Sequence, residues 1–434
     1  MNKKPLSKRY LERWLPIIVC SMASFFYIYD FLVRVVPSAI THPLMQAFHA
    51  NAAGLGLLAS AFFWGYAPMQ IPAGLLYDHF GPRKLLSISI LSCALATIAF
   101  SLTHDLVLAS FCRFVMGFTG AFAFIGPLLI ASRWFPPERF SFFTGVVQFM
   151  GCVGAIVGLS PIAALSHAFG WRQANILIAL GGIAASALIW LIIRDYPPDR
   201  NVFLVASEVK EVEKPTTALR RLFEVCRLRQ TWWIGLYGFS VWAPIDIIAT
   251  LWGTPFLMSL YNISATKASG LVSIIWVGIG LGSPLIGWWS NYIHRRCLPT
   301  WICSILAFGA GIGMIYSGPI PLVWMAVLLF VLGFSAAGQI ISFGLVLDNQ
   351  RDAVMGTAVG FNNMVVILGG VFLQPLVGFL LSFFWHHEMR HGIPYYSMFE
   401  YHRALIIVPI VSLVGLFTSL FLIEETRCER KFPS

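Results

Sequence analysis

Charged residues are scarce in this chain: Asp, Glu, Lys and Arg make up 11% of its 434 residues. A soluble globular protein carries about 25%. Apolar residues make up 58% of the chain, so too little polar surface remains to coat a soluble particle. These proportions exclude a soluble globular protein and predict an integral membrane protein.

Motifs of enzymes and metal sites are also missing. The eight cysteines include no C-x-x-C pair and lie mostly in apolar blocks, which is typical of small hydrophobic residues rather than metal ligands or disulfides. We find no phosphate-binding loop, metal-ligand cluster or nucleophile elbow. The sequence therefore predicts no enzyme activity, no cofactor and no metal.

Long apolar stretches are abundant. A helix needs about 20 apolar residues to cross the hydrocarbon core of a bilayer. Twelve stretches meet that length, near residues 14–36, 52–76, 84–103, 106–131, 141–165, 172–194, 231–258, 268–292, 299–317, 321–347, 353–381 and 402–424. The long polar stretch 195–230 divides them six and six. We predict an all-α protein with a bundle at 1–194, a linker at 195–230 and a second bundle at 231–434.

Lys and Arg predict the orientation. If the N-terminus is cytoplasmic, the inner segments hold 23 of the 29 Lys and Arg residues. That bias is the positive-inside rule, and it places both termini in the cytoplasm. It also accounts for the net charge of +10, so no nucleic-acid partner is expected.

The two sets of spans repeat in sequence. "FVMGFTGA" at 114–121 recurs as "FVLGFSAA" at 330–337, an offset of 216 residues, and Asp30 and Asp246 have the same offset. Each fifth span also has an amide side chain thirteen residues before a proline. Internal repeats of this kind are typical of secondary transporters.

A loop after the second span carries a family resemblance. "GLLYDHFGPRK" at 74–84 resembles the signature loop of the major facilitator superfamily, G-x-x-x-D-R-x-G-R-[RK], with His79 in place of the usual basic residue. The matching residues are Gly74, Asp78, Gly81, Arg83 and Lys84. "RFVMG" from Arg113 and "GWR" at 170–172 resemble further family segments, so the resemblance covers the whole chain.

The resemblance implies the major facilitator fold: two pseudo-symmetric six-helix bundles around a central cavity that opens alternately to each side. It also implies that Asp78 and its loop form a charge latch for one of those states, against the alternative of a solvated turn. We expect a monomer in the bilayer whose partners are a small-molecule substrate and protons.

A finer resemblance concerns the branch of the family. "YDFLVRVVPSAI" in the first span and "EETRC" at the end are similar to the phagosomal-transporter (Pht) branch of intracellular bacteria. That branch implies uptake of amino acids or nucleosides across the bacterial inner membrane, and related members are associated with siderophores. Span five has Ser160-Pro161 instead of the Gly-Pro pair of drug antiporters, which argues against drug efflux.

Charges inside the spans are candidate site residues, because a charge at membrane depth costs roughly 3 kcal/mol or more. Asp30 and Arg34 are one helical turn apart and share a face. Arg113 lies at a similar depth and is expected to pair with Asp30. Asp246 has no such partner, since Leu329 occupies the position equivalent to Arg113. An unpaired buried acid binds a proton readily or anchors a substrate ammonium; the alternative is that these charges only neutralise one another.

Polar and aromatic residues within the spans suit a small polar solute. The candidates are Tyr27, Trp64, Tyr66, Gln70, Gln148, Trp276, Gln339, Asn362 and Asn363. Two buried cations against two acids favour a zwitterion or neutral solute, so we predict proton-coupled import of an amino acid or nucleoside-like molecule. Siderophore or organic-anion transport, drug efflux and a non-transporting receptor remain alternatives. The loop at 382–401 is a candidate cap over the outer mouth.

Overall fold

A computed structural model describes residues 6–135, 137–196, 215–390 and 392–432. Within these ranges, 12 helical segments are long and apolar enough to cross a membrane. The predicted all-α fold with twelve spans is confirmed, with boundaries a few residues from those expected.

Nine helices precede residue 195 in the part of the chain that the structure describes. They are α1 (Leu6–Ala39), α2 (Thr41–Ala47), α3 (Ala52–Met69), α4 (Pro72–Phe80), α5 (Pro82–Leu102), α6 (Leu106–Gly120), α7 (Phe122–Trp134), α8 (Pro137–Phe169) and α9 (Trp171–Ile192). The second span is broken between α3 and α4 at Pro72, which lies at the first position of α4, where its missing N–H is not needed. The fourth span is broken between α6 and α7.

The described elements after residue 214 follow. The elements are α10 (Pro215–Arg227), α11 (Arg229–Ile247), η2 (Ile248–Trp252), α12 (Gly253–Tyr261), α13 (Ala265–Tyr292), α14 (Cys297–Tyr316), α15 (Leu322–Ala336), α16 (Gln339–Asn349), η3 (Asp352–Val354), α17 (Met355–Phe383), β1 (Met389–Arg390), β2 (Ile393–Pro394), α18 (Met398–Ala404) and α19 (Ile407–Phe421). The strands β1 and β2 form an antiparallel hairpin. The turn η2 is a π-helix, a local insertion often found at functional sites.

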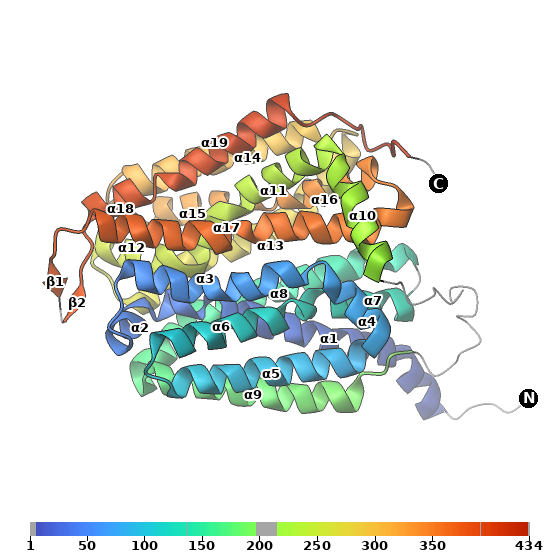
Figure 1. Cartoon of the computed structure of the whole chain (residues 1–434), viewed down its shortest axis with the longest axis horizontal. Helices are drawn as coiled ribbons and strands as arrows, with labels where there is room; N and C mark the ends of the chain where they lie inside the picture. Colours follow the sequence, from blue (N-terminus) through green and yellow to red (C-terminus); the bar gives the residue numbers. More distant parts are fainter. Residues whose placement is uncertain (1–5, 136, 197–214, 391, 433–434) are drawn as a thin grey trace, which may run out of the picture.

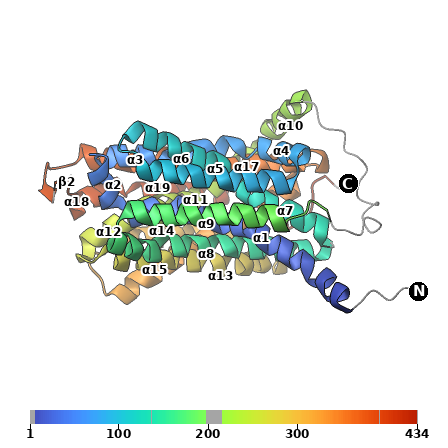
Figure 2. The ribbon, with the colours of Figure 1, turned by 90° about the horizontal axis from the view of Figure 1, so that it is seen from below.

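Two groups of helices lie side by side along the long axis, with α1–α9 below and α11–α19 above in Figure 1. We refer to them as the first half and the second half. Broad contacts join α3 to α17 and α8 to α13, and α1 packs against η2. The turned view in Figure 2 places α10 at the margin, near one end of the spans.

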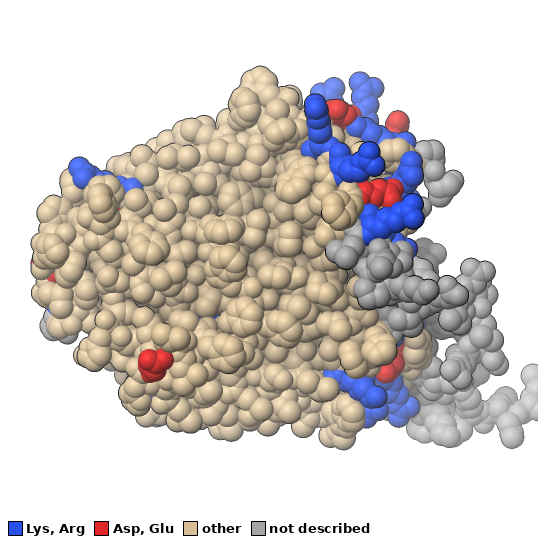
Figure 3. All heavy atoms as spheres, in the orientation of Figure 1, with Lys and Arg blue, Asp and Glu red and all other residues tan. Residues whose placement is uncertain are grey.

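The two ends of the molecule differ in charge. One end carries α2, the hairpin and α18, and we call it the hairpin end. The other carries α4 and α10, and we call it the basic end because Lys and Arg side chains gather there in Figure 3. The positive-inside rule predicts that the basic end is cytoplasmic. That orientation stays a prediction.

Glycines allow the helices to touch backbone to backbone. A side chain at Gly117 of α6 would place its Cβ 1.7 Å from the carbonyl oxygen of Phe62 in α3. At Gly154 of α8 the Cβ would lie 2.1 Å from the carbonyl oxygen of Ile28 in α1. Small residues at such crossings are how membrane helices gain close packing without a hydrophobic driving force.

Candidate functional site

Asp30 and Arg34 form a buried ion pair on α1. Arg34 Nη2 donates to Asp30 Oδ2 at 2.8 Å, so the predicted pairing is confirmed. Aromatic rings surround the guanidinium, with the centroids of Phe31 and Tyr66 at 4.4 Å and 4.5 Å. The ring faces attract the cation and take the place of water around it.

Arg113 binds the backbone of α1 and departs from the expectation that it pairs with Asp30. Its Nη1 donates to the carbonyl oxygen of Val33 at 2.9 Å, and its Nη2 donates to that of Arg34 at 3.4 Å. These carbonyls lie three and four residues beyond Asp30 toward the hairpin end. The depth inferred from the sequence was therefore one helical turn in error, and one turn is enough to exchange a carboxylate for backbone carbonyls.

Asp246 lies in the second half, in the last turn of α11 and two residues before the π-turn η2. Its Oδ2 accepts a hydrogen bond from the backbone N–H of Gly370 in α17 at 3.0 Å. Gln374 Nε2 donates to its backbone carbonyl at 2.7 Å. Among the residues that the structure describes, Asp246 forms no ion pair, but the charge of Arg34 in the first half acts on it. The side chain of Asp246 is buried, with 1% of the residue exposed.

A single ring links the two acidic sites. A Cβ at Gly370 would lie 2.4 Å from the ring of Phe63 in α3, so the ring packs directly on that glycine. The same ring lies 5.8 Å from the Arg34 guanidinium. Arg34, Phe63, Gly370 and Asp246 are therefore contiguous across the boundary between the halves.

The predicted aromatic and amide residues divide into separate clusters. Tyr27 donates to Gln148 Oε1 at 3.4 Å. The ring of Phe31 packs between those of Tyr27 and Trp276, with its centroid 4.8 Å from the first and 5.4 Å from the second. In a separate cluster, Asn363 Nδ2 of the second half donates to Gln70 Oε1 of the first half at 2.7 Å.

Other candidates lie apart from these clusters. Asn362 donates to Ser342 Oγ at 3.0 Å within the second half. Gln339 begins α16 and is half-buried. Trp64 is 50% exposed and packs edge-on against Phe372, itself exposed, so the structure places it on the lateral surface rather than among the buried candidates.

The signature loop is fastened within its own half. Gly81 has a φ of +76°, which favours glycine, and it connects α4 to α5. The backbone N–H of Arg83 donates to Asp195 Oδ1 at 2.8 Å, and Arg83 Nε donates to the carbonyl oxygen of Trp190 at 2.8 Å. Lys84 is exposed and Gly74 faces open space. The side chain of Asp78 lies outside the described part of the structure, so the latch stays a prediction.

The second half has a counterpart of this arrangement. Glu425 accepts hydrogen bonds from the backbone N–H groups of Arg296 and Cys297, both at 2.8 Å, at the start of α14. Partial burial opposes ionisation of Glu425, but these N–H donors hold the pKa of its carboxyl below the usual range. Arg296 in turn binds Asn291 Oδ1 at 2.9 Å and Asp348 Oδ2 at 3.0 Å.

Sequence reasoning missed the acids that fasten these loops. Asp195 and Glu425 each follow the last span of their half, in "RDYPP" and "EETRC". Their shared place shortly after the last span of each half was the available signal. In the part of the chain that the structure describes, no three His, Cys, Asp or Glu residues are grouped to hold a metal ion.

The repeat itself is visible as a contact. Ser38 and Thr254 are 216 residues apart, and their hydroxyl oxygens lie 2.8 Å from each other across the two halves. This is the offset that relates Asp30 to Asp246. Two equivalent residues meet only where the pseudo-twofold axis passes between them.

Comparison with known sequences agrees with this architecture. The profile of the Major Facilitator Superfamily matches residues 17–374. The chain belongs to the Major Facilitator Superfamily. It is 22% identical to the uncharacterized transporter YybO of Bacillus subtilis, over 88% of this chain and 90% of that protein. It is also 22% identical to the probable galactarate/D-glucarate transporter GarP of Escherichia coli K12, over 98% and 97%. The chloroplastic ascorbate transporter of Arabidopsis thaliana is 24% identical, over 88% and 72%.

Solved structures of the superfamily share the fold. A bacterial homolog to the human lysosomal transporter Spinster, inward-facing and unoccupied, has a TM-score of 0.73 at 16% identity, with 96% of this chain and 98% of that chain covered. A D-xylose–proton symporter has a TM-score of 0.69 at 14% identity, over 95% and 98%. This member of the superfamily is therefore a multi-pass secondary transporter of a small molecule and not an enzyme.

Proposed function

We propose that this transporter carries a small hydroxylated organic anion of the sugar-acid type, together with a proton. The observation that carries the proposal is that Arg34 and Arg113, each 3% exposed, have Nε donors with no hydrogen-bond partner among the described residues. Arginine is suited to carboxylates because its fork of N–H donors matches their geometry. The galactarate/D-glucarate and ascorbate transporters named above support an anionic, hydroxyl-rich substrate.

Charge balance gives the reason for a proton. Arg34 contacts Asp30 at 2.8 Å and is linked to Asp246 through the Phe63 ring and Gly370. A substrate carboxylate that binds Arg34 adds a negative charge to a buried set that already holds two acids. Uncompensated charge is costly away from water, so a proton that enters with the anion offsets it. Asp246 is the proposed proton carrier because it has no ion-pair partner of its own among the described residues.

A zwitterion is the second candidate, as the sequence predicts. The observation that favours it is again the Asp246 carboxylate, which accepts a backbone N–H and lies near no basic side chain of its own half in the described residues. A substrate ammonium would provide that missing partner. An amino acid would then place its carboxylate toward the arginines and its ammonium toward Asp246.

The test is a thermal-shift screen of the purified chain followed by counterflow in vesicles. The probes are D-glucarate, ascorbate, alanine and uridine. We expect D-glucarate or ascorbate to raise the melting temperature and to exchange across the membrane. Stabilisation by alanine alone would favour a zwitterion over a sugar acid as the substrate. Stabilisation by uridine alone would contradict both proposed substrate classes. Binding without exchange would mark a receptor.

Arg113→Lys tests the role of the first-half arginines. A single ammonium cannot reproduce the bonds that the guanidinium makes to both Val33 and Arg34. We expect D-glucarate binding to weaken about tenfold, as for the loss of one charge-assisted hydrogen bond of ~1.5 kcal/mol.

The matched control for this variant is Arg172→Lys. Arg172 also has an Nε donor without a partner, but it is only half-buried, lies at the start of α9 near the hairpin end and donates to a single carbonyl, that of Thr103 at 3.1 Å. This control should bind D-glucarate as the parent does. Parental affinity in Arg113→Lys, measured by titration calorimetry, would show that Arg113 does not serve the substrate.

Finer features remain predictions. They are the relation to the Pht branch, import rather than export, location in a bacterial inner membrane with both termini in the cytoplasm, and a monomeric state. A substrate found in the screen allows the direction to be measured in vesicles of known orientation.

A further inference from the structure

The start of α3 is capped by the opposite half of the molecule. The first N–H groups of a helix have no partner within that helix. Asn51 Oδ1 accepts one of them, from Gly54 at 2.9 Å. The N–H of Ala52 donates to the hydroxyl oxygen of Tyr396 at 3.0 Å, and that of Ala53 donates to Ser382 Oγ at 3.1 Å. We call these two bonds the hairpin clasp.

The helices at the clasp are in direct contact. A Cβ at Gly378 of α17 would lie 2.3 Å from the carbonyl oxygen of Ala52. One turn further in, a Cβ at Gly56 of α3 would lie 2.9 Å from the carbonyl oxygen of Gln374. No side chain separates the backbones at these points, so the hydroxyl groups of the second half reach the first turn of α3.

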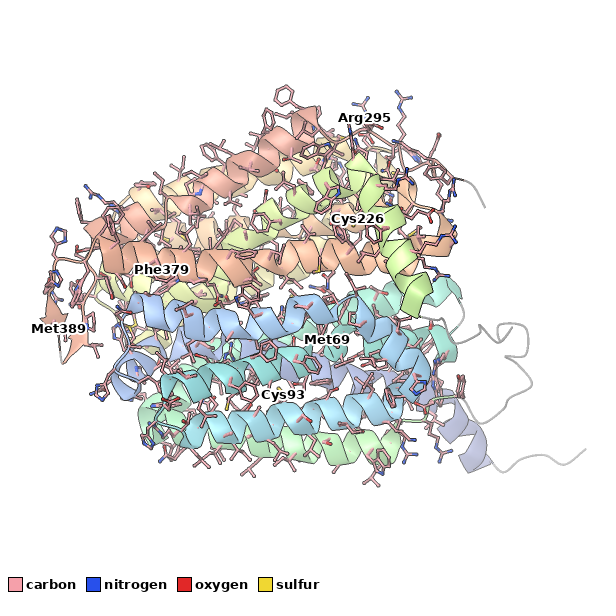
Figure 4. The ribbon with its side chains drawn as sticks, in the orientation of Figure 1. Met69, Cys93, Cys226, Arg295, Phe379 and Met389 are labelled. Carbon is pink, nitrogen blue, oxygen red and sulfur yellow. The ribbon has the colours of Figure 1, made fainter. Side chains whose placement is uncertain are left out.

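The acceptors of the clasp are held firmly in the second half. Ser259 Oγ of α12 donates to the carbonyl oxygen of Tyr396 at 3.1 Å. Trp385 Nε1 donates to the carbonyl oxygen of Tyr395 at 3.1 Å, which ties the two sides of the hairpin loop together. Figure 4 shows Phe379 on α17 and Met389 in the hairpin at this same end. Burial raises the pKa of Tyr396, so its hydroxyl stays neutral.

We propose that Tyr396 and Ser382 are positioning residues of the transport cycle, which favour the state closed at the hairpin end. Their hydroxyl groups cap α3 only while the two halves are together there. In alternating access the halves part at one end at a time. Opening the hairpin end therefore breaks both bonds and leaves the N–H groups of Ala52 and Ala53 to water. Each bond shifts the ratio of closed to open state about fivefold.

The test uses the full chain in lipid nanodiscs, without substrate. Spin labels on non-natural amino acids at Val107 and Val323, 77% and 73% exposed at the hairpin end of the two halves, leave the native cysteines unchanged. Electron–electron resonance gives the fraction of molecules with a long distance between them. Hydrogen exchange of residues 51–58 reports the capping directly. We expect Tyr396→Phe to raise the ratio of open to closed molecules about fivefold and to speed this exchange.

Tyr395→Phe is the matched control, because the hydroxyl of Tyr395 lies 3.4 Å from Ser259 Oγ within the same half. It should leave both measurements unchanged. Ser382→Ala is the second test variant and decides the matter if Tyr396→Phe does not fold. Parental distances and exchange in both test variants would overturn the proposal. An equal shift in Tyr395→Phe would show instead that hairpin stability, and not the clasp, sets the closed state.

Discussion

Three ionisable side chains, Asp30, Arg34 and Asp246, lie on the first spans of the two halves, where Arg34 pairs with Asp30 and Asp246 forms no ion pair among the described residues. Their partners differ in kind. Asp30 has the Arg34 guanidinium, whereas Asp246 has the backbone N–H of Gly370. A backbone donor keeps its position whether the acid is ionised or neutral. Asp246 can therefore change its protonation without losing the contact that holds it.

Asp246→Asn tests this role. The amide keeps an oxygen for the Gly370 N–H but cannot carry a proton between the faces. We expect the variant to exchange substrate across vesicles while failing to concentrate it under a proton gradient. Glu388→Gln, an exposed substitution in the hairpin loop, is the control and should accumulate substrate normally. Accumulation at the parental rate in Asp246→Asn would mean that this acid is structural.

Side-chain pairing could be predicted from the sequence only where spacing along one helix decides it. Asp30 and Arg34 are four residues apart, and that separation alone puts them on one face. Arg113 was placed by counting residues from a span end, which leaves an error of a turn, and its carbonyl partners depend on that turn. The Gly370 N–H is unavailable to sequence reasoning because every residue but proline has one.

At the scale of single elements, glycines without side chains set how closely neighbouring helices pack. Gly117 of α6 and Gly333 of α15 are equivalent in the two halves, and each lies against a carbonyl oxygen, that of Phe62 and that of Ile275. Helix length and polarity made the spans predictable. The π-turn η2 was not, since one inserted residue changes the hydrogen-bond pattern without changing composition.

Gly117→Ala tests this packing. Its Cβ would lie 1.7 Å from the Phe62 carbonyl oxygen, so α3 and α6 must separate. Overpacking of this kind costs about 1–3 kcal/mol or more, and we expect a clear fall in the melting temperature in detergent. The matched control is Gly181→Ala in α9, where a Cβ meets nothing within 4 Å. The control should be neutral or slightly stabilised, by about 0.5–1 kcal/mol. Equal melting of both variants would contradict the close approach.

Across the whole molecule, an acidic residue that follows the last span of each half binds the start of a helix at the basic end. Asp195 binds the start of α5, and Glu425 binds the start of α14, where a negative charge also complements the helix dipole. The tail after α19 continues from Glu425 to Lys431, whose N–H donates to the carbonyl oxygen of Asp348 at 2.8 Å. The tail thereby joins α14 to α16.

Glu425→Gln tests whether the contact between Glu425 and the start of α14 depends on pH. The folded-state pKa of Glu425 lies below its ordinary value of 4.5, so its ionised carboxylate stabilises the fold fully above pH 4.5. That stabilisation is lost as the pH falls from 4.5 through the folded-state pKa. The parent should melt higher than Glu425→Gln at pH 7, and the difference should shrink below about pH 4.5. Glu429→Gln, in the exposed tail, is the control and should follow the parent. A difference that does not change with pH would exclude the ionised carboxylate as its source.

The contact between Ser38 and Thr254 bears on how such a molecule came to exist. If a six-helix ancestor paired with a second copy of itself, the residue on the symmetry axis met its own image. A hydroxyl group both donates and accepts a hydrogen bond, so it is complementary to itself, whereas a lysine or a carboxylate would repel its image. A serine or threonine at this position would therefore make the same contact in a symmetric pair of identical copies as Ser38 and Thr254 make here.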